Sequence, residues 1–174
     1  MAQYELNQPD FAETSPTFAD GNPITGWAAI YNGLIPIATW VTYDNNTGRF
    51  TLSRPGVYQI ASSIQLFPAN DLNPGYNIIE DNPYNLYTYS VALGFYTSDG
   101  GPNPLAAPYI GFTRLSNVES TPILTIVYNF YVSESGVSFS VLNTSNVTIR
   151  TVNSQNSGTA GYISILRLGD SVLS

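Results

Sequence analysis

Cysteine, histidine and lysine are all absent from this chain of 174 residues. Without cysteine there is no disulfide framework and no thiolate nucleophile. Without histidine there is no imidazole metal ligand and no triad in which histidine is the base. Serine and threonine are abundant, but the sequence holds neither histidine nor lysine to activate a hydroxyl group. These absences argue against an enzyme, and the sequence indicates no catalytic residue and no cofactor.

Charge is scarce and mostly negative. Five basic residues, all of them arginine, stand against twelve acidic residues, which gives a net charge of −7. Non-specific binding to nucleic acid needs a basic patch that faces the phosphates, so no nucleic-acid binding is expected. The sequence has no apolar run of membrane-spanning length and no signal peptide within residues 1–20, so no membrane insertion is expected either.

Short β-rich segments separated by turn residues make up most of the chain after residue 24. The stretch Ile123–Val132 is apolar at nearly every position, which is typical of a strand buried on both faces. Turn residues at 133–136 and 143–146 predict two hairpins that follow this strand. No segment shows an apolar stripe with helical spacing, so the pattern predicts an all-β sandwich or barrel.

Residues 1–22 are polar and interrupted by prolines, and they predict an arm that precedes a folded domain of residues 23–174. Phe11 and Phe18 are unexplained apolar groups on this arm. We expect them to be attachment residues that order against a larger assembly. The alternatives are a loosely ordered terminus, or two side chains that pack back on the protein itself.

The most informative stretch is residues 47–60, which predicts two strands joined by a tight corner. Phe50 lies on the first strand, and Tyr58 and Ile60 face one way on the second, because strand side chains alternate with period 2. Pro55-Gly56 forms the corner, since proline fixes φ and glycine tolerates positive φ. We expect Phe50 and Tyr58 to be buried core residues.

This stretch resembles the globular head domain of the first complement component, which shares a jelly roll with the tumour necrosis factor superfamily. The family pattern is an aromatic residue or Asn, a turn, and then T-G-x-F-x-x-x-x-P-G-x-Y-x-F. The middle of the chain departs from the family, whereas the final strand again looks similar. The residues that carry the resemblance are Tyr43, Gly48, Phe50, Pro55, Gly56, Tyr58, Ile60 in place of the last Phe, and Tyr162 in the final strand.

The resemblance implies a jelly-roll β-sandwich of about ten strands that forms a compact homotrimer. The apolar strand Ile123–Val132 agrees with this. One of its faces can fill the core of the sandwich, and the other face needs a cover that a neighbouring subunit could supply. The alternative is a cover from a loop or from the N-terminal arm of the same subunit.

For function, the resemblance and composition favour a non-enzymatic structural or adhesive surface protein. We favour a virion spike, fibre head or capsid-decoration protein. The alternatives are a secreted or spore-surface complement-like binding head, which a collagen-like stalk normally precedes, and a carbohydrate-binding β-sandwich. The expected partners are further copies in a homotrimer, and a larger assembly, a surface receptor or a glycan. The expected location is the virion surface, or the extracellular space or cell surface.

Two further groups of residues are candidate sites. Glu80 and Asp81, with Asp71 and Asp99 in nearby loops, could supply oxygen ligands for calcium, but no calcium-loop spacing is present and solvated loop acids are favoured. Three asparagines fit the pattern for glycosylation, and the preference of asparagine for turns explains them equally well. They are Asn45, Asn143 and Asn146.

Overall fold

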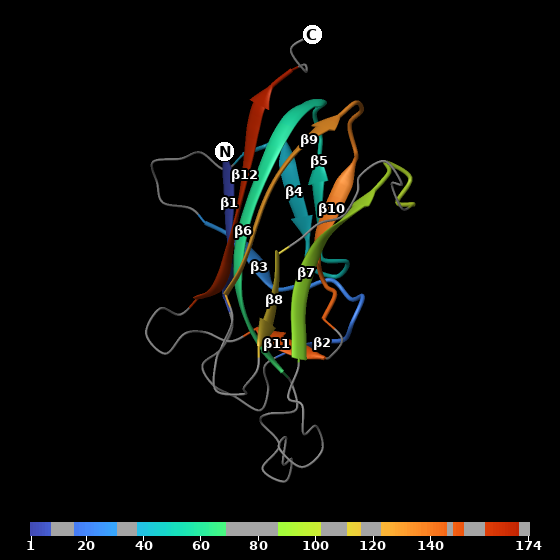
Figure 1. The fold of residues 1–174 in the computed structure, drawn as a ribbon. Coiled ribbons are helices and arrows are strands. Elements are labelled where there is room, and N and C mark those ends of the chain that lie inside the picture. The colour runs from blue at the N-terminus through green and yellow to red at the C-terminus, as the bar shows by residue number, and fades with distance from the viewer. Residues whose placement is uncertain are drawn as a thin grey trace, which may run out of the picture.

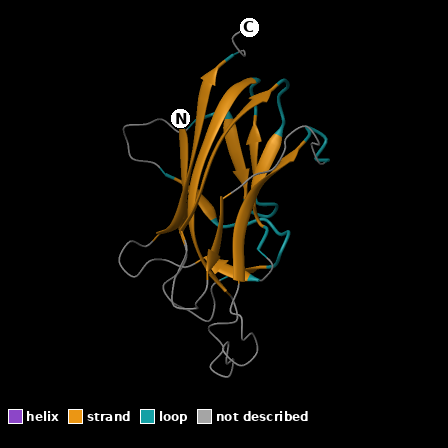
Figure 2. Ribbon diagram, in the orientation of Figure 1, coloured by secondary structure: helices purple, strands orange, loops and turns teal. Residues whose placement is uncertain are grey.

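The structure is a computed structural model that describes residues 1–7, 16–30, 38–68, 87–101, 111–115, 123–145, 148–151 and 159–170. Within these residues all regular structure is β, and no helix is present that could cross a membrane (Figure 2). The twelve strands form two antiparallel sheets (Figure 1). They are β1 Ala2–Asn7, β2 Thr17–Phe18, β3 Trp27–Ala29, β4 Val41–Asp44, β5 Arg49–Leu52, β6 Gly56–Pro68, β7 Tyr87–Tyr96, β8 Gly111–Leu115, β9 Ile123–Val132, β10 Ser138–Asn143, β11 Ile149–Thr151 and β12 Thr159–Gly169.

Strand β6 is the centre of the larger sheet. This sheet has seven strands in the order β2-β11-β6-β12-β1-β3, and β9 also pairs with β6. Strands β9 and β12 both pair with residues 57–64 of β6, so they lie along its two opposite edges. The second sheet has five strands in the order β4-β5-β10-β7-β8. The expected all-β sandwich is confirmed. Its strand number exceeds the expected ten because β2, β3 and β11 are pairings of only two or three residues.

The core lies between the two sheets and is rich in aromatic rings. The ring of Phe50 on β5 lies with its centroid 5.0 Å from that of Tyr4 on β1, in the opposite sheet. Its centroid is also 4.6 Å from that of Tyr43 and 5.1 Å from that of Phe139. Tilted and edge-on contacts of this kind stabilise aromatic pairs beyond the effect of buried area alone. Phe50 is therefore the centre of a ring cluster that joins both layers.

The prediction of two hairpins after β9 is wrong. Strand β9 pairs with β6 in the larger sheet, whereas β10 pairs with β5 and β7 in the smaller one. Strand β11 then returns to the larger sheet, where it pairs with β6 and β2. The residues at 133–136 reverse the chain as expected, but a turn signal is local. The sheet that a strand joins is set by distant partners and by which face is buried.

The N-terminal residues also differ from the expected arm. Strand β1 pairs with β12 on one side and β3 on the other, so it is an inner strand of the larger sheet. Ala2, Tyr4 and Leu6 are buried and alternate with half-buried Gln3 and Glu5, and this period-2 pattern explains the strand. The prolines that argued against regular structure fall after it, so the first residues of the chain belong to the folded domain.

Candidate functional site: the exposed face of the seven-stranded sheet

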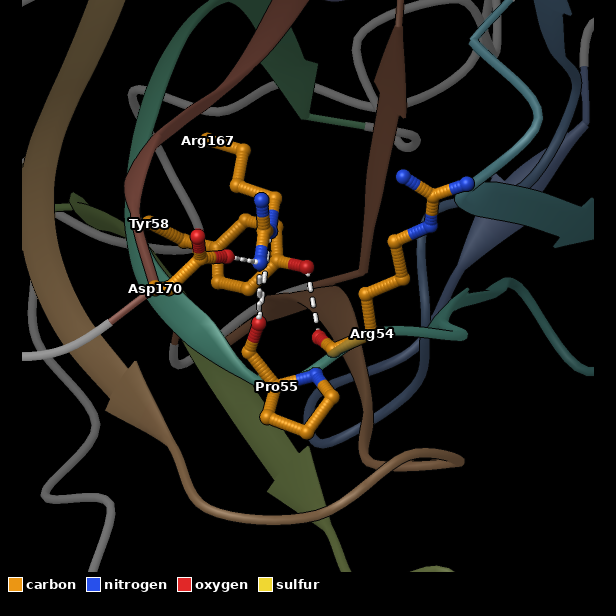
Figure 3. Close-up of polar contacts among 5 residues, drawn as sticks. All are labelled: Arg54, Pro55, Tyr58, Arg167 and Asp170. Atoms are coloured by element: carbon orange, nitrogen blue, oxygen red, sulfur yellow. Dashed lines mark hydrogen bonds and ion pairs between the residues drawn. The ribbon is translucent and has the colours of Figure 1, made fainter.

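The corner between β5 and β6 carries the central part of the sequence motif and has a structural role. Tyr58 is fully buried, and its hydroxyl donates a hydrogen bond of 2.6 Å to the carbonyl oxygen of Arg54 (Figure 3). Arg167 on β12 reaches across, donates to the Pro55 carbonyl at 2.8 Å, and forms an ion pair with Asp170. Burial raises the pKa of Tyr58, and Asp170 raises the pKa of Arg167. These contacts tie the crossing between sheets to the last strand.

The residues of the motif outside this corner are buried or half-buried, except for Tyr162. Ile60 is fully buried, and Gly48 is buried with φ of +67°, where a Cβ would lie 2.7 Å from that of Pro23. Tyr43 is half-buried, and its hydroxyl accepts a hydrogen bond of 3.2 Å from the amide of Gly26. Tyr162, the motif residue in the final strand, is 49% exposed and does not belong to the core. Ile163 and Ile165, next to it on β12, are fully buried, and the alternation of side chains along the strand leaves Tyr162 on the outer face.

Strand β9 has an outer face of large apolar side chains. Ile123 is 65% exposed, Val127 63% and Tyr131 51%, whereas Leu124 and Ile126 between them are almost fully buried. The sequence predicted a strand that is buried on both faces, but the structure of the single chain covers only the inner face. The outer face is the surface that the sequence indicated would need a cover.

Neighbouring strands extend this surface without adding charge. Ala61 and Val57 on β6 stand opposite Val127 and Tyr131 in the β-ladder. Tyr162 and Leu168 add two further exposed apolar side chains from β12. Neither β6 nor β9 contains a charged residue. We call this surface, on the outer side of β9, β6 and β12, the neutral face; it is made by Val57, Ala61, Ile123, Val127, Tyr131, Tyr162 and Leu168.

Two pairs of polar side chains on this side of the sheet are hydrogen-bonded to one another. Gln59 on β6 donates a hydrogen bond of 3.0 Å to the side-chain oxygen of Asn129 on β9. Gln3 on β1 lies within 3.5 Å of the hydroxyl of Ser164 on β12. Such uncharged, paired groups cost little to remove from water. The part of the neutral face on β6 and β9 is therefore suited to close contact with another protein surface. Glu5 on β1, which pairs with Tyr162, places one acid beside the β12 edge of this face.

The other candidate sites have different outcomes. Phe18 is buried in the core and its strand pairs with β11, so its expected role as an exposed attachment residue is wrong. Phe11 lies outside the described residues, as do Asp71, Glu80 and Asp81. Asp99 accepts hydrogen bonds from the Thr97 hydroxyl and from the amide of Gly101, which lower its pKa. Among the described residues, no three acidic side chains lie close enough to hold a metal ion.

The asparagines that fit the glycosylation pattern differ in how far they are buried. Asn143 is fully buried; its side-chain nitrogen donates to the carbonyl of Phe18 at 2.9 Å and its oxygen accepts from the amide of Ser145 at 2.9 Å. Asn143 is therefore inaccessible in the folded protein. Asn45 is exposed, and its side-chain oxygen accepts a hydrogen bond of 2.8 Å from the amide of Gly26. Asn146 lies outside the described residues.

Comparisons with known proteins identify the fold. No protein-family model matches the sequence, and the comparison with curated proteins gave no match. The structure matches the Eiger TNF of S. frugiperda with a TM-score of 0.61 and 13% identity, over 98% of this chain and 93% of that one. It matches the globular domain of the zebrafish complement 1qA protein (TM-score 0.52, 8% identity, 97% and 98% of the two chains). It also matches murine APRIL (TM-score 0.53, 9% identity, 96% and 98%).

These likenesses define the class of fold. The chain has the jelly-roll fold of the tumour-necrosis-factor-like and complement globular domains over nearly its whole length. The resemblance drawn from residues 43–60 and from the last strand is confirmed at the level of fold. Because the identities are so low, the likeness extends to the arrangement of the strands and not to what any of these proteins binds.

Proposed function

We propose that the protein is a non-enzymatic homotrimeric surface protein whose subunits contact one another through the neutral face. The observation that supports this is the exposure of Ile123, Val127 and Tyr131 on strands that carry no charge. Burial of such apolar surface contributes about 25 cal/mol per Å². Exposed apolar patches of this kind mark interaction sites.

A second copy of the same chain is the partner that this surface fits. Each chain carries a net charge of −7, so two copies repel one another unless they meet through an uncharged surface. A strongly charged partner would gain nothing from the neutral face. Closed rotational symmetry lets every subunit use the same two surfaces, and the resemblance to complement heads implies three subunits.

Within that role we favour display on a virion as a spike, fibre head or capsid-decoration protein that binds a surface receptor or a glycan. The composition supports a binding head over an enzyme, because the sequence has neither histidine nor lysine, the usual bases that activate a hydroxyl nucleophile. The likeness to the globular domain of complement 1qA supports a second candidate, a secreted or cell-surface head with the same architecture. Immunogold labelling of intact particles separates the two: labelled virions support the first, and label confined to cell surfaces or secretions contradicts it.

The absence of cysteine allows a background-free test of the neutral face. A Val127→Cys variant places one thiol on this face, and a Thr42→Cys variant places one on the exposed side of β4 in the other sheet. We expect a maleimide reagent to label the Thr42→Cys protein fully and the Val127→Cys protein only slowly, because neighbouring subunits cover Val127. Equal and rapid labelling of the two folded variants contradicts the proposed interface, since position 127 is accessible in a single subunit, where Val127 is 63% exposed.

A further inference from the structure

The outer side of the five-stranded sheet carries a polar pocket of about 320 Å³ that the sequence analysis missed. Its walls come from β5, from the turn before β5, from the residues after β7 and from the start of β10. They contribute five side-chain hydroxyl groups, one arginine and one aspartate. The residues are far apart in sequence and individually ordinary, so only the fold brings them together. The volume lies at the lower end of the range for small-molecule sites.

Arg49 is the one basic group among the described residues that line this pocket, and it lies opposite Asp44 in the β4–β5 ladder. Its guanidinium carbon lies 3.8 Å from the centroid of the Tyr96 ring, a cation–π contact that holds the guanidinium group in place. Among the described residues, no hydrogen bond or ion pair is formed by this guanidinium group. Gly100 leaves room beside it, because a Cβ at that position would lie 3.2 Å from a terminal nitrogen of Arg49. A guanidinium group offers five N–H donors in a fixed plane.

The remaining walls offer both donors and acceptors to a ligand. Thr51 and Ser138 face each other across the β5–β10 ladder, and their hydroxyls have no hydrogen-bond partner in the part of the chain that the structure describes. The hydroxyl of Thr47 donates a hydrogen bond of 2.7 Å to Asp44, so its proton is used and its oxygen remains able to accept a hydrogen bond. Asp44 also accepts from the amide of Asn46 at 3.0 Å, and both bonds favour its ionised form. Asp44 therefore remains a hydrogen-bond acceptor at the edge of the pocket.

We propose that this pocket binds a carboxylate-bearing sugar, such as the uronic or sialic acid residue of a glycan. A free guanidinium group binds a carboxylate through two parallel hydrogen bonds, and the ring hydroxyls of the sugar are matched by Asp44, Thr51 and Ser138. The nearby negative charge of Asp44 favours a singly charged carboxylate over a doubly charged phosphate. This proposal specifies the ligand class of the proposed binding head and rests on that role. The pocket is formed by residues of one chain, so binding does not require the trimer.

Titration of the native protein with free sugars tests this directly. D-glucuronic acid and D-glucose form a matched pair, because the two share the ring and its hydroxyls and differ only at C6, which is a carboxylate in the acid and a CH2OH group in glucose. N-acetylneuraminic acid and inorganic phosphate are the further probes. We expect saturable binding of at least one of the two acids in calorimetry or NMR titration. Glucose and phosphate should bind at least about tenfold more weakly, the ratio that corresponds to loss of one charge-assisted contact.

Arginine variants localise the binding. Arg49→Gln should weaken binding of the acid by about tenfold or more, whereas Arg54→Gln, which removes the same charge from an exposed arginine outside the pocket, should leave it unchanged. If Arg49→Gln impairs folding, a Thr51→Val, Ser138→Ala double variant removes two pocket hydroxyls without changing charge and should weaken binding several-fold.

Several results would overturn the proposal. The first is that neither acid shows saturable binding, and the second is that glucose or phosphate binds as tightly as the acid or more tightly. The third is that Arg49→Gln and Arg54→Gln lose the same affinity for the acid. The mass of the same sample in solution keeps this test separate from the proposed trimer. A monomer that binds the acid through Arg49 supports the pocket and contradicts the trimer, and a trimer that binds no acid does the reverse.

Discussion

Tyr58 combines two contributions to the corner between the sheets, one from its ring and one from its hydroxyl. The ring is fully buried between Trp40 and Phe130, with centroid separations of 5.6 and 5.8 Å. The hydroxyl closes a hydrogen bond to the Arg54 carbonyl within the corner itself. The structure therefore separates a packing effect from a hydrogen-bond effect at one residue.

Two substitutions at Tyr58 measure these contributions. Tyr58→Ala removes a buried aromatic ring and should lower the free energy of unfolding by about 3–5 kcal/mol. Tyr58→Phe keeps the ring and loses only the hydrogen bond, and should cost about 0.5–1.5 kcal/mol. Urea denaturation of the three proteins gives both numbers. An Ala variant as stable as the Phe variant would show that the ring is not packed as described.

The stability of the turn at residues 44–47 should depend on pH because of the Asp44 carboxylate. Its hydrogen bonds from the Thr47 hydroxyl and the Asn46 amide hold its pKa below the ordinary value of 3.8. A carboxylate whose folded-state pKa is lowered stabilises the protein above its unfolded-state pKa, and this stability is lost as the pH falls through the folded-state pKa. In Thr47→Val, which removes one donor, the folded-state pKa should rise and the acid loss should begin at higher pH.

NMR titration of the Asp44 carboxyl carbon in the two proteins checks this expectation, with Asp44→Asn as the control that removes the transition altogether. An unchanged titration midpoint in Thr47→Val would contradict the assigned cause. The carboxylate is exposed, so the effect on overall stability should be small compared with the effect of Tyr58→Ala.

Strand β1 makes the first residues of the chain part of the larger sheet. It lies between β12 and β3, and Leu6 at its end is fully buried. A truncated protein that starts at Pro23 loses β1 and β2 and leaves the edges of β12 and β3 without partners. We expect it to melt at a clearly lower temperature or to aggregate, because exposed strand edges pair with other chains.

Leu6→Ala provides a milder version of the same test, with an expected loss of about 2–5 kcal/mol for a buried leucine. Thr17→Ala is the matched control, because Thr17 is exposed on the short strand β2. A truncated protein that melts like the full chain would show that β1 is dispensable, as its polar composition first suggested.

Local patterns in the sequence predicted individual elements well and their partners poorly. The bounds of Ile123–Val132 follow from a run that is apolar at nearly every position, and the corner at Pro55-Gly56 follows from the conformations that these two residues allow. Period-2 alternation also places Tyr162 outside the core once the neighbouring isoleucines are assigned inward. The sheet that β10 joins, the pairing of β1 and the pocket around Arg49 depend on contacts between distant segments, which no local pattern specifies.

The two outer faces of the sandwich have opposite characters. The neutral face on the seven-stranded sheet is apolar and free of charge on β6 and β9, whereas the five-stranded sheet carries a polar pocket that contains the guanidinium group of Arg49. In a trimer built through the neutral face, these pockets remain in the subunits' outward surfaces. Three copies of a weak glycan site would then act together, since linked sites gain effective concentration.

A charge placed on the neutral face should dissociate this assembly. Val127→Arg puts a guanidinium group into the proposed contact, where burial of an unpaired charge is strongly unfavourable. Thr42→Arg adds the same charge to an exposed position on the other sheet and should leave the assembly intact. Circular dichroism and thermal melts of the two variants verify that the β-sandwich itself is preserved.

Sedimentation equilibrium of the native chain at micromolar concentration tests the central proposal most directly. The account predicts a species of three times the 18.9 kDa chain mass for the native protein and for Thr42→Arg, and a single-chain mass for folded Val127→Arg. A native protein that sediments at the mass of one chain, or a Val127→Arg variant that remains trimeric, would contradict it.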